Sequence, residues 1–170
     1  CSGCPNITQI PVIDGLKKLD CSGRNLTHVP LIEGLQELNC SGCYNLAQIP
    51  VIDGLKKLDC SHCPSLTEIP RIEGLKELDC SWCYSLLELP HIEGLKKLYC
   101  LYCLNLIQIP NIRGLQELDC SNSHNICKIS HDRSLSRLKC EGCRMLTQVD
   151  PDMTVGEDDN YNGTWIYHES

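Results

Sequence analysis

Most cysteines of this chain come in Cys-x-x-Cys pairs, and that spacing suits three kinds of chemistry. The chain has 170 residues and 15 cysteines. Two such pairs can hold zinc in a tetrahedral site, neighbouring cysteines can close disulfides, and a thiolate beside a base can attack a substrate. Which chemistry applies depends on the elements that position the sulfur atoms. The pairs are Cys1/Cys4, Cys40/Cys43, Cys60/Cys63, Cys80/Cys83, Cys100/Cys103 and Cys140/Cys143.

The pairs belong to an internal repeat. Aligned on its Gly-Leu dipeptide, the unit reads G-L-x-x-L-x-C-S-x-C-x-x-L-x-x-I-P-x-I-E/D, and a period of this length is typical of a solenoid. Six of the seven full units have 20 residues, the unit that starts at Cys21 has 19, and a partial unit starts at Cys140. The full units are 1–20, 21–39, 40–59, 60–79, 80–99, 100–119 and 120–139.

The spacing inside one unit predicts its geometry. Leu78 and Cys80 stand two residues apart, so they share the inward face of a short strand. Leu86, Leu89 and Ile92 recur at steps of three, which favours a 3₁₀ or otherwise irregular return path. A proline in that path and the short turn leave no room for a regular helix. The predicted fold is a solenoid of parallel strands, with about eight turns and little regular helix.

Through these units the chain resembles the leucine-rich repeat family. The motif L-x-x-L-x-C-x-x-C-x-x-L-x-x-I/L-P occurs at 55–70 and again at 75–90. It is similar to the short repeats of bacterial effector proteins, and still more to cysteine-rich repeat proteins of giant DNA viruses of amoebae. The resemblance implies an open horseshoe over residues 1–149, with the strands on its concave face, and a protein-binding role. An acidic cap or tail, 150–170, is expected to follow.

Within the repeat we interpret the cysteines as core residues. The first cysteine of each pair takes an inward strand position, and a buried thiol behaves as a small hydrophobic group. The second takes the position where leucine-rich repeats usually carry an asparagine that bonds neighbouring turns. Zinc and disulfides are the alternatives. We expect no metal or cofactor, and thiols in this number indicate an intracellular, reducing compartment: host cytoplasm or virion, for a viral protein.

One cysteine, Cys127, lies off the two repeat positions. His124 and His131 flank it in the sequence, which is the only arrangement that suggests a nucleophile and a base. A catalytic thiolate needs an accessible and electropositive setting. We interpret Cys127 as a return-path residue in a degenerate unit, and we expect no enzymatic activity.

Departures from the repeat consensus predict a binding site. Aromatic or apolar residues replace small or polar ones on two adjacent strands, and Trp and Tyr are the residues that most often anchor protein interfaces. We therefore expect a patch for a protein partner on the concave face. The alternatives are drift on a solvated face, or simple packing of Trp82 on Tyr102 across strands. The candidate residues are Trp82, Tyr84, Tyr99, Leu101 and Tyr102, with the acidic Asp79 and Asp119 around them.

Alternating charges follow the outward face of the predicted strands. Lysines and glutamates take turns at one repeat position, which predicts ion pairs between neighbouring strands. Such exposed pairs usually form a solvated face and add little stability. The column consists of Lys18, Glu37, Lys57, Glu77, Lys97 and Glu117.

Composition and the two ends restrict the partners. The net charge of −7 without a basic block argues against nucleic acid, and no apolar run is long enough to span a membrane. The sequence opens in mid-repeat at Cys1, and an uncapped strand edge pairs readily with another chain. Two alternatives follow: residues are missing before Cys1, or that edge contacts a partner, for instance by self-association. The acidic tail carries the apolar stretch 164–167, which suggests a docked strand or cap rather than a disordered segment.

These features predict a non-catalytic protein-interaction module that binds its partner through the concave face. One alternative is a structural protein that assembles through its open solenoid edge. Another is the substrate-recognition part of a longer effector, such as a ubiquitin ligase, because bacterial repeats of this type precede a separate catalytic domain. The tail of this chain is too short to be such a domain.

Overall fold

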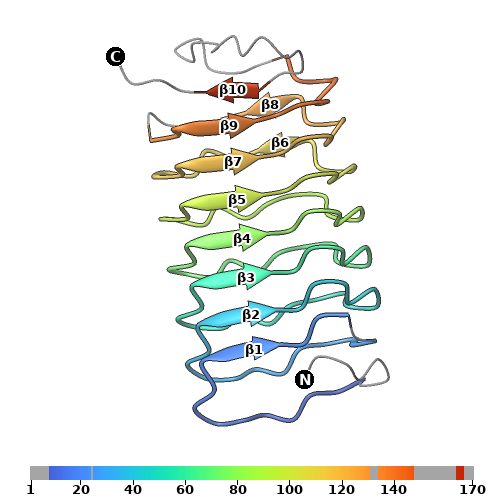
Figure 1. The fold of residues 1–170 in the computed structure, drawn as a ribbon, viewed down its shortest axis with the longest axis vertical. Coiled ribbons are helices and arrows are strands. Elements are labelled where there is room, and N and C mark those ends of the chain that lie inside the picture. The colour runs from blue at the N-terminus through green and yellow to red at the C-terminus, as the bar shows by residue number, and fades with distance from the viewer. Residues whose placement is uncertain (1–7, 24, 131–133, 148–163, 167–170) are drawn as a thin grey trace.

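The chain winds into a ladder of stacked parallel strands (Figure 1). The structure is a computed structural model, and it describes residues 8–23, 25–130, 134–147 and, as backbone only, 164–166. Each turn of the ladder contributes one short strand, then two tight turns, then an extended return path behind the strands.

Seven strands form one parallel sheet in chain order. Neighbouring strands pair residue for residue, as Leu58 pairs with Leu78 and Leu78 with Leu98. Because the register is constant, each repeat position forms a column that runs along the whole sheet. The strands are β1 (Lys18–Asp20), β2 (Glu37–Asn39), β3 (Lys57–Asp59), β4 (Glu77–Asp79), β5 (Lys97–Tyr99), β7 (Glu117–Asp119) and β9 (Arg137–Lys139).

The return path is irregular, and its ordered parts are two short strands. β6 (Gln108–Ile109) and β8 (Lys128–Ile129) pair in parallel behind the main sheet. The described ranges contain no helix of any kind, so the predicted solenoid with an irregular return side is confirmed. Seven parallel strands give about six turns, slightly fewer than the eight predicted, because the unit that starts at Cys140 adds no parallel strand among the described residues.

The repeat positions that were predicted to face inward form one continuous core. The chain reverses direction at each tight turn, so residues two or three apart all reach the same interior. Full burial of one leucine or isoleucine contributes about 1.5–3 kcal/mol, and each turn repeats this contribution. In the turn 60–79 the buried side chains are Cys60, Cys63, Leu66, Ile69, Ile72, Leu75 and Leu78.

The second cysteine of each pair bonds the preceding turn. Cys83 Sγ donates to the carbonyl oxygen of Cys60 at 3.2 Å, and the equivalent bonds elsewhere measure 3.1–3.3 Å. Ser123 takes this position in its own turn, and its hydroxyl donates to the carbonyl oxygen of Cys100 at 2.7 Å. Since a serine makes the same bond, the position requires a small buried donor rather than sulfur chemistry.

A glycine opens the bend before six of the seven strands of the main sheet, and Ser134 stands there before β9. Gly74 has a φ of +79°, a left-handed backbone that glycine adopts without steric cost. Lys56 Nζ of the preceding turn donates to the carbonyl oxygen of Gly74 at 3.5 Å. The bend therefore depends on glycine and is tied to the turn before it.

A short strand from the tail extends the sheet at its C-terminal end. β10 (Thr164–Ile166) pairs with β9 in the antiparallel sense, so it covers the outer edge of β9 (Figure 1). The predicted domain boundary at 149/150 and the cysteines Cys1 and Cys4 lie outside the described residues. In the part of the chain that the structure describes, no helix has the length and apolar character needed to cross a membrane.

Candidate functional site

The outward side chains of the strands form two columns, which together we call the strand face. In the first column, basic residues alternate with glutamates, and ion pairs join neighbouring strands. Lys18 Nζ lies 2.8 Å from Glu37 Oε1. Lys57 Nζ lies 3.1 Å from Glu77 Oε2, and Lys97 Nζ lies 4.0 Å from Glu77 Oε1. The predicted cross-strand pairs are confirmed, and their exposure means that each contributes little to stability.

In the second column, an aspartate or asparagine ends five of the seven strands and closes the following turn. Asp59 Oδ1 accepts hydrogen bonds from the backbone N–H of Ser61 at 3.0 Å and from its hydroxyl at 2.8 Å. Asp119 makes the same two bonds with Ser121, at 3.1 and 2.7 Å. Asn39 keeps the backbone bond at 3.0 Å. The aspartate column therefore has a structural role in the turns, whatever else it does.

The turn after β5 lacks the aspartate and the serine together. Tyr99 and Leu101 stand in their places, and the Leu101 N–H donates instead to Ser81 Oγ of the preceding turn, at 3.3 Å. Tyr99 lies on the strand face, where its hydroxyl donates to the Glu117 carboxylate. Partial burial and the negative charge of Glu117 raise the pKa of Tyr99. Both side chains of the usual aspartate–serine turn are therefore replaced after β5.

The repeat position directly after Ser81 and Leu101 adopts a left-handed backbone in each turn where it is described. Glycine suits this conformation, but four turns place a larger residue there, and two of these residues are Trp82 and Tyr102. The left-handed backbone costs roughly 1–2 kcal/mol for a residue with a Cβ atom and is rare for bulky side chains. The φ angles are +64° at Gly23, +69° at Gly42, +55° at His62, +63° at Trp82, +53° at Tyr102, +62° at Asn122 and +71° at Gly142.

Three of these strained residues stack on one another. The Trp82 and Tyr102 rings have centroids 3.9 Å apart and planes inclined by 20°. The His62 ring stacks on the other side of Trp82, with centroids 5.1 Å apart and planes inclined by 10°. Tyr84 meets Trp82 edge-on, at 6.1 Å. The packing of Trp82 on Tyr102, which was one of the two alternatives to a binding patch, is therefore present. It leaves both rings half exposed.

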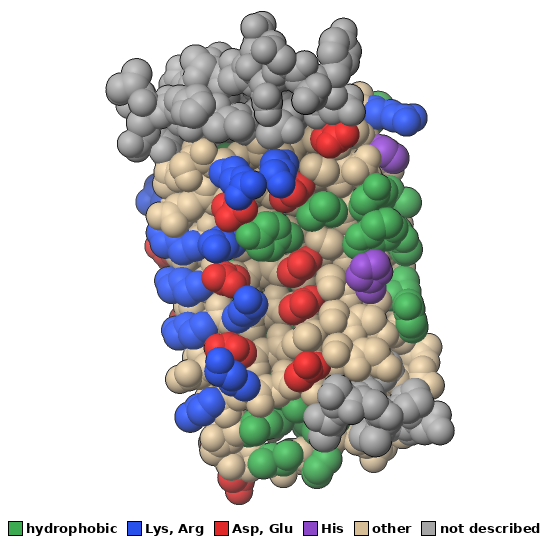
Figure 2. All heavy atoms as spheres, viewed as in Figure 1, with side chains coloured by type: hydrophobic (Ala, Val, Ile, Leu, Met, Phe, Trp, Pro, Cys, Tyr) green, Lys and Arg blue, Asp and Glu red, His purple; other side chains and the backbone are tan. Residues whose placement is uncertain are grey.

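Exposed apolar side chains continue this cluster around the turns. Tyr84 is 38% exposed, and Leu104, at the same position one turn later, is 36% exposed. Farther along the same two turns, Leu87 and Ile107 are 61% and 58% exposed. Figure 2 shows hydrophobic side chains gathered along this margin of the strand face. We call the cluster of His62, Trp82, Tyr84, Tyr102 and Leu104 the aromatic edge.

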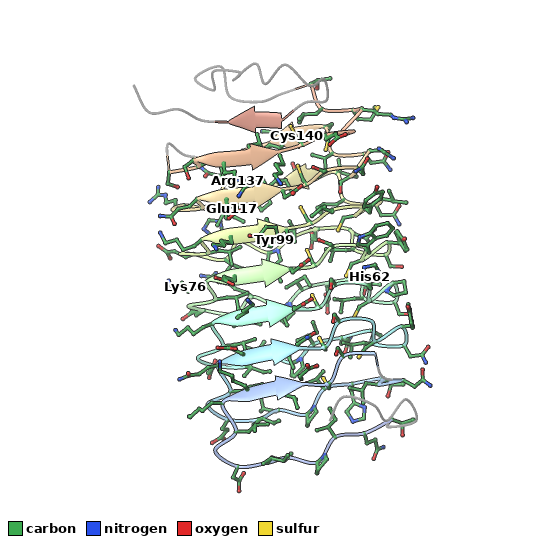
Figure 3. The ribbon with its side chains drawn as sticks, viewed as in Figure 1. His62, Lys76, Tyr99, Glu117, Arg137 and Cys140 are labelled. Atoms are coloured by element: carbon green, nitrogen blue, oxygen red, sulfur yellow. The ribbon has the colours of Figure 1, made fainter. Side chains whose placement is uncertain are left out.

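The structure divides the predicted site residues between two surfaces. Trp82, Tyr84 and Tyr102 meet on the aromatic edge, whereas Tyr99 lies over the strands (Figure 3). Leu101 is half-buried in the turn between them. The aspartates follow the strand face: Asp119 Oδ2 lies 3.7 Å from Lys139 Nζ, and Asp79 accepts from the Ser81 N–H at 3.0 Å.

Three residues of this region, His62, Leu87 and Ile107, were not among the predicted site residues. His62 occupies the same repeat position as Trp82 and Tyr102, and that shared position is the signal by which it could have been identified. Leu87 and Ile107 replace the threonine or alanine found at their position in other turns, such as Thr67. Both are departures from a polar consensus, but on the return path rather than on the strands.

Two aspartates, Asp59 and Asp79, lie side by side on neighbouring strands next to the aromatic edge. Asp59 pairs in register with Asp79 across β3 and β4. Burial raises the pKa of Asp79 and the charge of Asp59 adds to this, while hydrogen bonds from Ser81 and the nearby His62 oppose it. Asp59 and Asp79 end the strands whose following turns carry His62 and Trp82, so the aspartate pair lies beside the aromatic stack.

Buried thiols in the core are poor nucleophiles. A hydrogen bond with Cys83, together with burial, raises the pKa of Cys60 well above the usual value, and Cys103 has the same effect on Cys80. Cys143 differs because it is only half-buried. A hydrogen bond with Cys120, whose Sγ lies 3.9 Å away, lowers the pKa of Cys143.

The metal and nucleophile alternatives gain no support from the described residues. Over the described ranges, no three His, Cys, Asp or Glu side chains lie close enough to hold a metal ion. Cys127 is half-buried, and the His124 ring nitrogen Nδ1 lies 2.7 Å from the carbonyl oxygen of Gly142. His131 lies outside the described residues.

Comparisons with protein-family models, with curated proteins and with solved structures find no match. The chain is a repeat solenoid with a unit of about 20 residues and a cysteine-rich core. Its most unusual surface is the aromatic edge beside the strand face.

Proposed function

We propose that this protein is a non-catalytic binding module of the leucine-rich repeat type, which docks a protein partner on the aromatic edge and the adjoining strand face. The observation that carries the proposal is the left-handed backbone at Trp82 and Tyr102. Glycine stands at this position in other turns, so bulky rings there need a reason outside the backbone. A partner that covers the rings is such a reason, since strained residues concentrate at functional sites.

The energies of the free molecule support this proposal. Each left-handed aromatic residue costs roughly 1–2 kcal/mol, and a stacked ring pair returns about 0.5–1.5 kcal/mol. Trp82 and Tyr102 together therefore cost roughly 2–4 kcal/mol, which is more than their one stacked pair returns, so stacking alone does not offset the strain while the rings remain half exposed. Burial of the remaining ring area by a partner would add a favourable term that the isolated chain lacks.

The assignment to the leucine-rich repeat type rests on the core. The L-x-x-L-x-C spacing produces a strand with Leu78 and Cys80 buried, and the second cysteine bonds the neighbouring turn as the family's asparagine is expected to do. Thiols with raised pKa values in a dry core favour a structural role and a reducing compartment. These features support a binding scaffold rather than an enzyme.

A variant that restores the repeat consensus tests the proposal. Glycine at 82 and 102 relieves the backbone strain, and Tyr99→Asp with Leu101→Ser rebuilds the turn bonds seen at Asp59 and Asp119. We expect this fourfold variant to fold and to lose partner capture when the immobilised protein is incubated with extract of its source cells. Quantitative mass spectrometry of the captured proteins measures the loss.

A matched control alters apolar residues on the opposite side of the turn. Leu31 and Val51 are 54% and 53% exposed, so Leu31→Thr with Val51→Thr removes apolar surface away from the aromatic edge. Capture by this variant should equal that of the wild type. If the consensus variant retains the wild-type partners, the aromatic edge is not the contact and the proposal fails.

A further inference from the structure

Two carboxylates on the strand face lack the cation that their neighbours have. Glu37, Glu77 and Asp119 each lie within 4.0 Å of a lysine nitrogen. Within the described part of the chain, Asp59 and Asp79 form no ion pair and are bonded only by the serines of their own turns. They end the two strands whose following turns carry His62 and Trp82.

The environment of this pair favours a positive charge from outside the chain. Asp59 and Asp79 are in register on adjacent parallel strands, which lie about 4.8 Å apart. Like charges opposite one another on neighbouring strands are destabilising. The pKa of Asp79 is raised because burial disfavours its ionised form, and repulsion by the charge of Asp59 adds to this effect. A cation placed between the two carboxylates would remove this repulsion.

The aromatic edge supplies the other half of a recognition surface. The rings of His62, which is exposed, and Trp82, which is half-buried, lie on the turns that follow Asp59 and Asp79, and guanidinium groups stack favourably on such rings. Tyr84 and Leu104 offer exposed apolar surface on the far side of the stack. The surface thus presents negative charge, then aromatic rings, then aliphatic groups.

We propose that the aromatic edge binds a protein segment in which an arginine or lysine precedes apolar residues, with the basic group between Asp59 and Asp79. The charge complementarity selects this occupant over others. Phosphate groups of nucleic acid would be repelled by the aspartate pair and by the net charge of −7. A metal ion would need more converging ligands than two carboxylates in register provide. This inference rests on the proposed binding function and adds the chemistry of the partner.

A random dodecapeptide library displayed on phage tests the inference directly. We expect peptides selected on the intact protein to be enriched in an arginine or lysine followed by apolar residues. Affinity of the best synthetic peptide is then measured by calorimetry. The double variant Asp59→Asn with Asp79→Asn should weaken it by about tenfold or more and reduce its dependence on salt. Asn39 shows that asparagine keeps the turn bond at this position, so the variant retains its turns.

The control removes two acidic charges elsewhere. Asp53→Asn with Glu73→Gln changes the net charge equally, but both residues are exposed at the bend before the strands. This variant should bind the peptide as the wild type does. Trp82→Gly with Tyr102→Gly should weaken binding by removing the rings.

The outcomes separate the two proposals. If selected peptides carry no basic residue, or if the Asp59/Asp79 variant binds as tightly as the wild type while the Trp82/Tyr102 variant does not, the basic partner is wrong and the binding edge stands. If the Trp82/Tyr102 variant also binds as the wild type, the aromatic edge is not a docking surface and the proposed function falls with it. A library that yields no enriched peptide overturns the inference of a linear basic segment.

Discussion

At the scale of single residues, the left-handed position after each strand has opposite requirements in different turns. Glycine at 23, 42 and 142 adopts the left-handed backbone without steric strain. Trp82 and Tyr102 adopt it with strain, and their rings stack on each other. In ordinary strand or helix positions glycine is the destabilising choice relative to alanine. Here the order should reverse, because alanine has a Cβ atom and no ring.

This reversal predicts which of two substitutions at Trp82 gives the more stable protein. Trp82→Gly should be more stable than Trp82→Ala by about 1 kcal/mol, since both lose the stack and only glycine relieves the backbone. Urea denaturation followed by far-ultraviolet circular dichroism measures the difference. At Glu77, in the middle of the sheet, glycine should be the less stable of the two. A Trp82→Ala protein that is more stable than Trp82→Gly contradicts the account of strain.

At the scale of elements, adjacent turns are joined by side chains as well as by the sheet. The second cysteine of each pair reaches back to the preceding turn, and Ser123 shows that oxygen can replace sulfur in this bond. The relevant property is a donor that fits a dry, narrow site.

Substitutions at Cys83 test that property. Cys83→Ser keeps the donor and should stay within about 1 kcal/mol of the wild type in unfolding free energy, whereas Cys83→Ala leaves the carbonyl oxygen of Cys60 without it and should lose about 1–3 kcal/mol. Urea midpoints at constant m-value measure both. Equal stability of the two variants would mean that sulfur packing, and not the hydrogen bond, selects cysteine.

The aspartate pair makes stability depend on pH. The pKa of the Asp79 carboxyl is raised in the folded state, so the folded protein binds a proton at Asp79 more tightly than the unfolded chain does. The folding stability that this protonation contributes is lost as pH rises through the folded pKa. Asp79→Asn should therefore be more stable than the wild type at pH 7, by about 0.2–1 kcal/mol. Below the pKa of an ordinary aspartate the two proteins should be equal.

Urea unfolding at pH 3 and pH 7 measures this difference. Asp119→Asn is the contrasting variant, because Asp119 pairs with Lys139 and its loss removes an attraction. If Asp79→Asn were less stable than the wild type at pH 7, the hydrogen bonds from Ser81 would outweigh the repulsion by Asp59.

The elements of this fold were predictable because every inward position repeats. The two-residue spacing of Leu78 and Cys80 identified the strand, and the three-residue steps from Leu86 onward identified a return path without a helix. The same periodicity predicted that Lys57 and Glu77 would pair across strands. Averaging over several units made these signals stronger than any single segment allows.

The geometry of the candidate site was only partly predictable. Sequence grouped Tyr99 with Trp82 and Tyr102, because all three depart from the consensus, but it could not show that Tyr99 faces Glu117 on the strand face. The stack depends on a φ angle near +60°, which turns the side chain after the serine away from the strands. Nothing in the spacing of aromatic residues encodes that rotation, and His62 was missed although it shares the repeat position of Trp82 and Tyr102.

At the scale of the whole molecule, each turn contacts only its neighbours. The main sheet follows chain order from β1 to β9, and the core has the same composition in successive turns. In such a solenoid, stability is close to a sum over turns and the interfaces between them. Whole turns should therefore be removable without loss of the fold.

Deletion of residues 40–79 tests this property. It removes two turns and joins Asn39 to Cys80, so the repeat register continues across the junction. The shortened protein should unfold cooperatively with an m-value lower by about a quarter, since m scales with the surface exposed on unfolding. Deletion of residues 45–79, which is not a whole number of turns, should abolish cooperative unfolding by turning core leucines outward.

The alternating column on the strand face has a consequence for how such a chain can change its length. Lys57, Glu77 and Lys97 attract their neighbours only because odd and even turns carry opposite signs. Duplication of one turn would set lysine beside lysine or glutamate beside glutamate, whereas duplication of two turns would preserve every attraction. The core therefore has a period of one turn and the surface a period of two, so that gains or losses of turns in even numbers disturb the protein least.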